Sequence, residues 1–326
     1  MEKRLVTKLV QAMELEKGEA VLLNFWGEKA DLQELYDFAS AVAEEGAMPM
    51  LQLHIPELEA AVFNELEGEV PEKWVQQMEA ADVAIDLMCR RPGMIPEKLK
   101  EEKCSLYGAY LQQMFGVLGE KKKMIQVTVP TRANAESVGM DYKTYKELMI
   151  KALDIDYEKL KEDCNKKCEA YTEDVRTIRT GKDCVLTMKT TDREWIVDAG
   201  DGALPCGEIY IAPVEEETNG TIFFENLEVE DLGSFKEVTV KVQEGHIVDS
   251  TCQEFNDFIK ELPEGGDIVA EFGIGMNPNV DRMLSNPSLD ENAIGTFHIA
   301  IGMNHMFGGK NRCPVHMDFV TEGSIE

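Results

Sequence analysis

The sequence predicts an α/β domain followed by an α+β domain, and three observations support this. The chain has 326 residues, which is more than one typical core requires. Short apolar runs alternate with helical patterns over the first half. After Gly181 the pattern changes to short alternating stretches divided by Gly, Asn and Asp turns. We therefore expect an open, mainly parallel α/β domain over 1–180 and an antiparallel, β-rich, metal-binding domain over 181–326.

The first half reads as a series of strands that alternate with helices. Strands are predicted at 20–25, 48–55, 83–89 and 122–130, and helices at 5–16, 31–47, 57–66 and 71–81. Two highly charged helical segments, 142–153 and 156–179, predict a bridge at the end of this domain. No glycine-rich phosphate motif follows any strand, so we expect no nucleotide site. His54 ends the second strand, and we interpret it as a structural histidine.

The second half reads as many short strands and one helix. Alternating or apolar stretches occur at 184–191, 193–200, 207–214, 220–227, 237–250, 267–275, 296–302 and 315–320, and a helix is predicted at 252–262. This spacing is typical of an antiparallel β domain.

Charge and composition exclude several classes of function. Acidic residues number 62 against 33 basic ones, and the net charge of −29 would repel the phosphates of nucleic acid. No apolar run is long enough to cross a membrane, and residues 1–20 carry charges where a signal peptide needs an apolar stretch. We expect a cytoplasmic protein whose eight cysteines are reduced thiols, with no nucleic-acid or membrane partner.

Acids and histidines stand in the strands of the second half where the apolar pattern predicts burial. His316 and Asp318 are two residues apart, so they point to the same face of a strand. His298, Glu271 and Glu208 each belong to a different predicted strand. Burying charge is costly unless the charge is paired or binds a metal. Ordinary ion pairs would explain any one of these residues, but the whole set favours a metal site, and more specifically a two-metal site.

Four segments carry a resemblance to a known family. LPCGEIYIAPV, EFGIGMNPNV, LDENAIGTFHIAIG and HMDF occur here in the same order as in the M29 metallo-aminopeptidases of the thermophilic aminopeptidase T type. The resemblance is strong over residues 180–320 and general over the first domain. It implies a hydrolase that removes N-terminal amino acids from peptides with a free N-terminus, and a homodimer.

The resemblance also implies the ligands of two divalent metal ions, which would be Zn, Co or Mn. By motif these ligands are Glu208, Glu271, His298, His305, His316 and Asp318. At His305 the family has a tyrosine, seven residues after the first histidine. The resemblance implies that a carboxylate, Glu208 or Glu271, is the catalytic proton acceptor. The family also continues into a closing hairpin, whereas this sequence has eight residues after Asp318.

Two alternatives remain open from the sequence. His298, His316 and Asp318 alone form the two-histidine, one-carboxylate set of mononuclear Fe(II) ring-opening dioxygenases, some of which resemble M29 proteins. A non-catalytic metal-binding relative is the second alternative.

Overall fold

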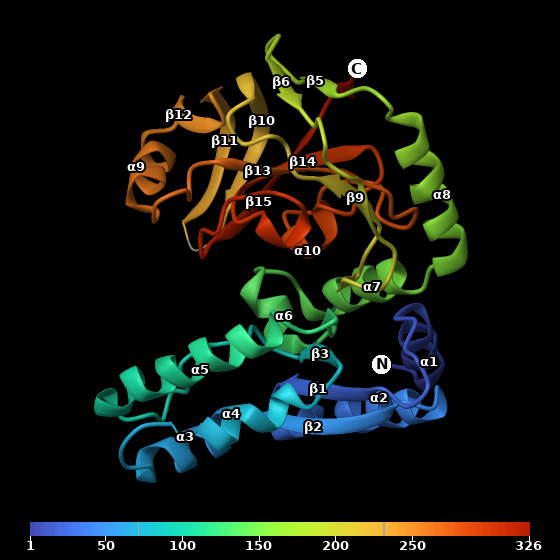
Figure 1. Ribbon diagram of the computed structural model, residues 1–326, viewed down its shortest axis with the longest axis vertical. Helices are drawn as coiled ribbons and strands as arrows, with labels where there is room; N and C mark the ends of the chain where they lie inside the picture. The colour runs from blue at the N-terminus through green and yellow to red at the C-terminus, as the bar shows by residue number, and fades with distance from the viewer. Residues whose placement is uncertain (71, 231) are drawn as a thin grey trace. The chain divides into compact units, whose positions relative to one another are not determined.

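The chain divides into two compact units in the computed structural model, which describes residues 1–70, 72–230 and 232–326. The first unit comprises residues 1–154 and 200–206, and the second comprises 155–199 and 207–326. The predicted division at 180/181 therefore falls inside the second unit. The reason is that α8 (Tyr157–Ala170) packs on strands β7 (Ile196–Asp198) and β9 (Glu208–Ile211), as Figure 1 shows for β9.

The first unit is a parallel sheet with helices, as predicted. Its strands, in order across the sheet, are β2 (Met48–His54), β1 (Ala20–Trp26), β3 (Val83–Met88), β4 (Lys123–Thr128) and β8 (Ala203–Leu204). All four pairings are parallel. Six of the seven residues of β1 are buried, as expected of a strand covered on both faces. The short β8 is contributed by a segment far along the chain, which no local pattern predicts.

Seven α-helices occur among the described residues of this unit. They are α1 (Lys3–Ala12), α2 (Leu32–Glu44), α3 (Pro56–Glu65), α4 (Glu72–Glu79), α5 (Cys104–Leu118), α6 (Arg132–Ser137) and α7 (Tyr142–Leu153). Two short 3₁₀ turns, η1 (Lys29–Asp31) and η2 (Glu101–Lys103), precede α2 and α5. The predicted start of the fourth helix at Pro71 lies outside the described residues. No helix was predicted from the sequence in the region of α5.

His54 is part of the core of the first unit. Its ring stacks on Trp26 at 3.8 Å between centroids. Its Nδ1 lies 2.9 Å from Glu59 Oε1, and its Nε2 lies 2.7 Å from Asn24 Oδ1. The side chain is 1% exposed, so the interpretation as a structural histidine agrees with its surroundings.

The second unit contains two antiparallel sheets. One has the order β12 (His246–Ser250), β11 (Gly233–Gln243), β10 (Asn219–Val229), β6 (Val185–Lys189), β5 (Val175–Arg179), β16 (Ser324–Ile325). The other has the order β15 (His316–Glu322), β14 (Thr296–Gly302), β13 (Val269–Gly275), β9, β7. Helix α9 (Gln253–Glu261) lies beside β12, and a short α10 (Pro287–Asp290) precedes β14 (Figure 1). The rings of Phe224, Phe255 and Phe319 meet between the sheets.

One prediction for this unit is wrong. Residues 175–179 were expected to extend the charged helix, but they form β5. Arg176 and Ile178 are buried while their neighbours are half-buried or exposed, which is the alternation of a strand. The partners of β5 are β6 and the distant β16, so its pairing depends on contacts remote in sequence.

Candidate metal centre

Four neighbouring strands, β9, β13, β14 and β15, bring together five of the six predicted ligands. Those ligands are Glu208 from β9, Glu271 from β13, His298 from β14, and His316 and Asp318 from β15. The register explains how they meet, because Glu271 and Asp318 both lie opposite Ala300, one on each side of β14. Residues in register on adjacent strands project from the same face of a sheet.

The side chains form two groups of ligand atoms that share one residue. Glu208, Glu271 and His298 form the first group, and Glu271, His316 and Asp318 form the second, with all atoms of a group within 4.8 Å of one another. Glu271 Oε1 lies 3.3 Å from His298 Nε2, and its Oε2 lies 3.5 Å from His316 Nε2. The two oxygens of Glu271 thus serve different groups.

His298 is the most buried of these residues, with 1% of its side chain exposed. Its Nε2 lies 3.3 Å from Glu208 Oε2 and 3.9 Å from Asp318 Oδ1. Gly273, directly opposite on β13, makes room for the ring, because a Cβ there would lie 2.0 Å from His298 Nε2. The first glycine of the EFGIG segment, Gly273, therefore leaves the space that the His298 imidazole occupies.

His316 is held by the backbone. Its Nδ1 donates to the carbonyl of Met303 at 2.8 Å, which leaves Nε2 as the nitrogen available to a ligand. Nε2 lies 3.7 Å from Asp318 Oδ1. The side chains of His316 and Asp318 are 27% and 25% exposed, so the second group is the more accessible one.

The charge balance of this cluster suits divalent cations. Burial raises the pKa of Glu208 well above its usual range, and the charges of Glu291 and Glu271 raise it further. Glu208 Oε2 is buried and has no hydrogen-bond partner in the described part of the chain. Burial lowers the pKa of His298, but its hydrogen bond to Glu271 and the charge of Asp318 outweigh burial and leave the pKa raised. Buried carboxylates in excess over imidazoles are the donor set that divalent metals prefer.

Two acids near the centre were not predicted from the sequence. Glu291 directly follows α10, and burial together with the charges of Asp318 and Glu271 raises its pKa well above the usual range. Asp198, in β7, is buried and lies opposite Glu208 of β9. Glu291 is in the LDENAIG segment, but it lies on no periodic strand that would distinguish it from the chain's other acids.

The sixth predicted ligand, His305, lies in neither group of ligand atoms found among the described residues. It begins the 3₁₀ turn η3 (His305–Phe307), and its backbone N–H donates to the carbonyl of Asn311. Phe307 of the same turn packs edge-on against the ring of His316, with 5.8 Å between centroids. A role for His305 as a ligand remains a prediction.

Fold and site together define a metal-binding protein in which a parallel α/β unit accompanies an antiparallel unit carrying the ligands. The model of the thermophilic metalloprotease (M29) family matches residues 9–320, so the chain belongs to this family and is a metallopeptidase. The family expected from the sequence is thereby confirmed.

A solved structure supports the same fold. The chain is similar to wild-type AmpT from Thermus thermophilus, with a TM-score of 0.69 and 17% identity over 100% of this chain and 94% of that one. This likeness confirms the predicted fold class. No curated protein matches the sequence. None of the helices in the described ranges is both long and apolar enough to span a membrane.

Proposed function

We propose that this metallopeptidase is an aminopeptidase that uses two divalent metal ions. The observation that carries the proposal is the pair of ligand groups that share Glu271. In this proposal Glu208 and His298 would hold one ion, His316 and Asp318 would hold the other, and Glu271 would contribute to both sites. When bound, two such ions lower the pKa of a water and polarise the scissile carbonyl. Carboxylate and imidazole ligands suit Zn, Co or Mn.

The residues around the centre would accept the proton, fix the tautomer of a ligand and leave space for an imidazole. Glu208 suits the role of proton acceptor better than Glu271, because Glu271 has both oxygens facing imidazoles. The Met303 carbonyl fixes the tautomer of His316. Gly273 keeps the space that His298 occupies.

The test restores metal to chelator-treated protein and measures hydrolysis. With Zn²⁺, Co²⁺ or Mn²⁺, the protein should release the first amino acid from peptides with a free N-terminus and leave N-acetylated peptides intact. Elemental analysis should find two ions per chain. Equal cleavage of free and acetylated peptides would overturn the exopeptidase assignment.

The Fe(II) dioxygenase built on His298, His316 and Asp318, the alternative left open by the sequence, is disfavoured because the chain belongs to a metalloprotease family. It leaves Glu208 and the first ligand group without a role, which is why we favour the hydrolase.

We also propose that the protein acts as a homodimer. The support is the resemblance of the sequence to the M29 aminopeptidases. Light scattering at micromolar concentration should give twice the mass of one 36.6 kDa chain. A monomer at that concentration would contradict this proposal.

A further inference from the structure

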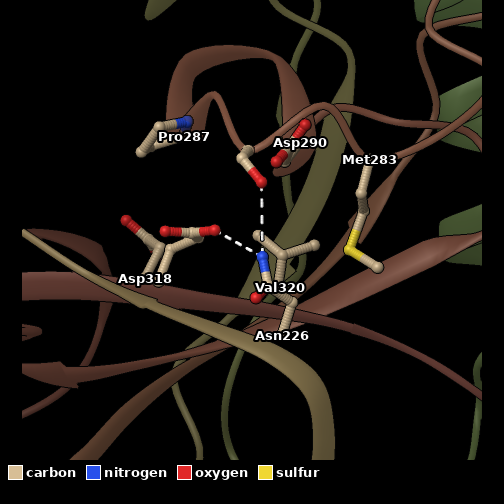
Figure 2. Close-up of a pocket in the computed structure, with 8 residues that line it drawn as sticks. Asn226, Met283, Pro287, Asp290, Asp318 and Val320 are labelled. Atoms are coloured by element: carbon tan, nitrogen blue, oxygen red, sulfur yellow. Dashed lines mark hydrogen bonds between the residues drawn. The ribbon is translucent and has the colours of Figure 1, made fainter. Parts of the chain in front are cut away.

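A pocket of ≈ 190 Å³ lies beside the candidate metal centre and within the same unit. Asp318, a ligand of the second group, is one of its lining residues. Met283, Pro287 and Val320 supply apolar walls, and Figure 2 shows the Met283 side chain turned toward Val320. Its volume is many times the space that one water needs. A substrate group attached next to the reacting bond therefore has room here.

Glu228 gives this pocket a negative charge. It lies on β10, in the sheet that does not carry the metal ligands, and lines the pocket with Asn226. Asn226 Nδ2 donates to Glu228 Oε1, and the Ser234 hydroxyl donates to Asn226 Oδ1 at 2.8 Å. Ser234 thus fixes the orientation of the amide, and the amide holds one oxygen of Glu228. The side chain of Glu228 is only partly buried, so it can contact a group that enters.

The other two carboxylates of the pocket have different partners. Asp318 lies close to both histidines of the centre. Asp290 is buried, and its two oxygens accept the backbone N–H groups of Leu284 and Asn286, at 2.6 and 3.0 Å. Asp290 thereby anchors the loop that forms one wall. None of the described residues that line the pocket is basic. Glu228 is therefore the carboxylate available to a substrate.

We infer that this pocket receives the side chain of the substrate's first residue and selects a cationic one, lysine or arginine. The inference rests on the proposed aminopeptidase function. The aliphatic stem of such a side chain contacts Met283, Pro287 and Val320, as long charged side chains do along apolar surfaces. Its charged end contacts Glu228, where a charge-assisted hydrogen bond is stronger than a neutral one.

The test compares 4-nitroanilides of lysine, norleucine and alanine, all with a free α-amine, on the metal-loaded protein. Norleucine matches the lysine stem but has no charge. We expect kcat/KM to be about tenfold higher for lysine than for norleucine, the effect of one charge-assisted hydrogen bond. Glu228→Gln keeps the shape and should bring this ratio close to one. The matched control is Glu225→Gln, an exposed position on the same strand, which should leave the ratio unchanged.

A second variant tests the location of the subsite apart from its charge. Met283→Trp narrows the pocket and should lower kcat/KM for lysine and norleucine alike, relative to alanine. Equal rates for lysine and norleucine in the unmodified protein would overturn the inference. So would a Glu228→Gln variant that keeps the lysine preference.

Failure of the proposed function is distinguishable from failure of this inference. If no anilide is cleaved, the aminopeptidase proposal fails. Calorimetry can then still measure the affinities of lysinamide and norleucinamide for the pocket. Tighter binding of lysinamide that Glu228→Gln abolishes would support the cationic subsite, and equal binding of the two amides would refute it.

Discussion

Each unit buries a histidine among acids, but the two surroundings differ in what they leave unsatisfied. In the first unit His54 has one partner for each ring nitrogen, Glu59 and Asn24. In the second unit a single nitrogen of His298 faces carboxylates from three other strands, at 3.3, 3.3 and 3.9 Å. In the first arrangement neighbouring side chains satisfy both ring nitrogens of His54. In the second, three negatively charged carboxylates gather around His298 Nε2. A buried histidine whose two ring nitrogens each have a partner stabilises a fold, whereas several carboxylates gathered around one ring nitrogen indicate a cation.

The network around His54 extends through the core of its unit. Asn24 Nδ2 donates to Asp86 Oδ1 at 2.6 Å, and the Tyr107 hydroxyl donates to Glu59 at 3.1 Å. Burial raises the pKa values of Asp86 and Tyr107, and Asp86 Oδ2 is buried without a hydrogen-bond partner among the described residues. Around His298, burial raises the pKa values of Glu208 and Glu291, and the negative charges of neighbouring acids raise both further. The comparison therefore distinguishes a structural cluster from the candidate metal centre.

The largest expected effect is on the residue shared by both ligand groups. Glu271→Ala should remove metal from both positions and lower peptidase kcat/KM by roughly 10³-fold or more, about 4 kcal/mol of transition-state stabilisation. Elemental analysis and rate measurements check this, with the exposed Glu225→Ala as the control. Retention of two ions in Glu271→Ala would contradict the proposal that Glu271 is a ligand of both ions.

The next largest effect is that of replacing His54, which should lower the free energy of unfolding without changing metal content. His54→Ala leaves Glu59 and Asn24 buried without their partner, which should cost about 2–4 kcal/mol in the free energy of unfolding. His246→Ala is a matched control, since that histidine pairs with Asp267 at the surface and should cost well under 1 kcal/mol. Denaturant unfolding and metal analysis together check the prediction. Loss of metal in His54→Ala would contradict the assignment of the His54 cluster as structural and separate from the metal centre.

A smaller effect concerns pH. The folded-state pKa values of Glu208 and Glu291 are raised, so these groups contribute stability below the ordinary pKa of glutamate, and that contribution is lost as pH rises through the raised values. Metal-free protein should therefore lose stability as pH rises above about 4.5. Bound cations replace the protons, so the stabilisation by metal should grow with pH, and metal binding should release protons.

Thermal unfolding with and without metal, at several pH values, measures this difference. Glu291→Gln should make the metal-free slope shallower, because it removes one of the two titrating acids. A melting temperature of the metal-free protein that rises steadily from pH 5 to 8 would contradict the assignment.

The sequence predicted the strand residues of the site better than those outside strands. His316 and Asp318 could be placed on one face because side chains alternate along a strand. Glu291 follows a four-residue helix, where no periodicity marks burial. Glu228 reaches the pocket from the other sheet, and that packing depends on contacts between distant segments. For the same reason β5 was taken for helix, since its partners lie elsewhere in the chain.

The smallest effect is expected at His305, the predicted ligand that joins neither group. Its turn is held by backbone hydrogen bonds to Asn311, so replacing the side chain should leave the turn in place. His305→Ala should keep two metal ions per chain and lower kcat/KM by about tenfold at most, the low end of the range for a residue that supports ligands without binding metal. His305→Tyr should keep both ions as well. His316→Ala is the comparison variant. It should lose metal, because His316 belongs to the second ligand group. If His305→Ala instead loses one ion per chain and His305→Tyr restores it, then His305 is a metal ligand.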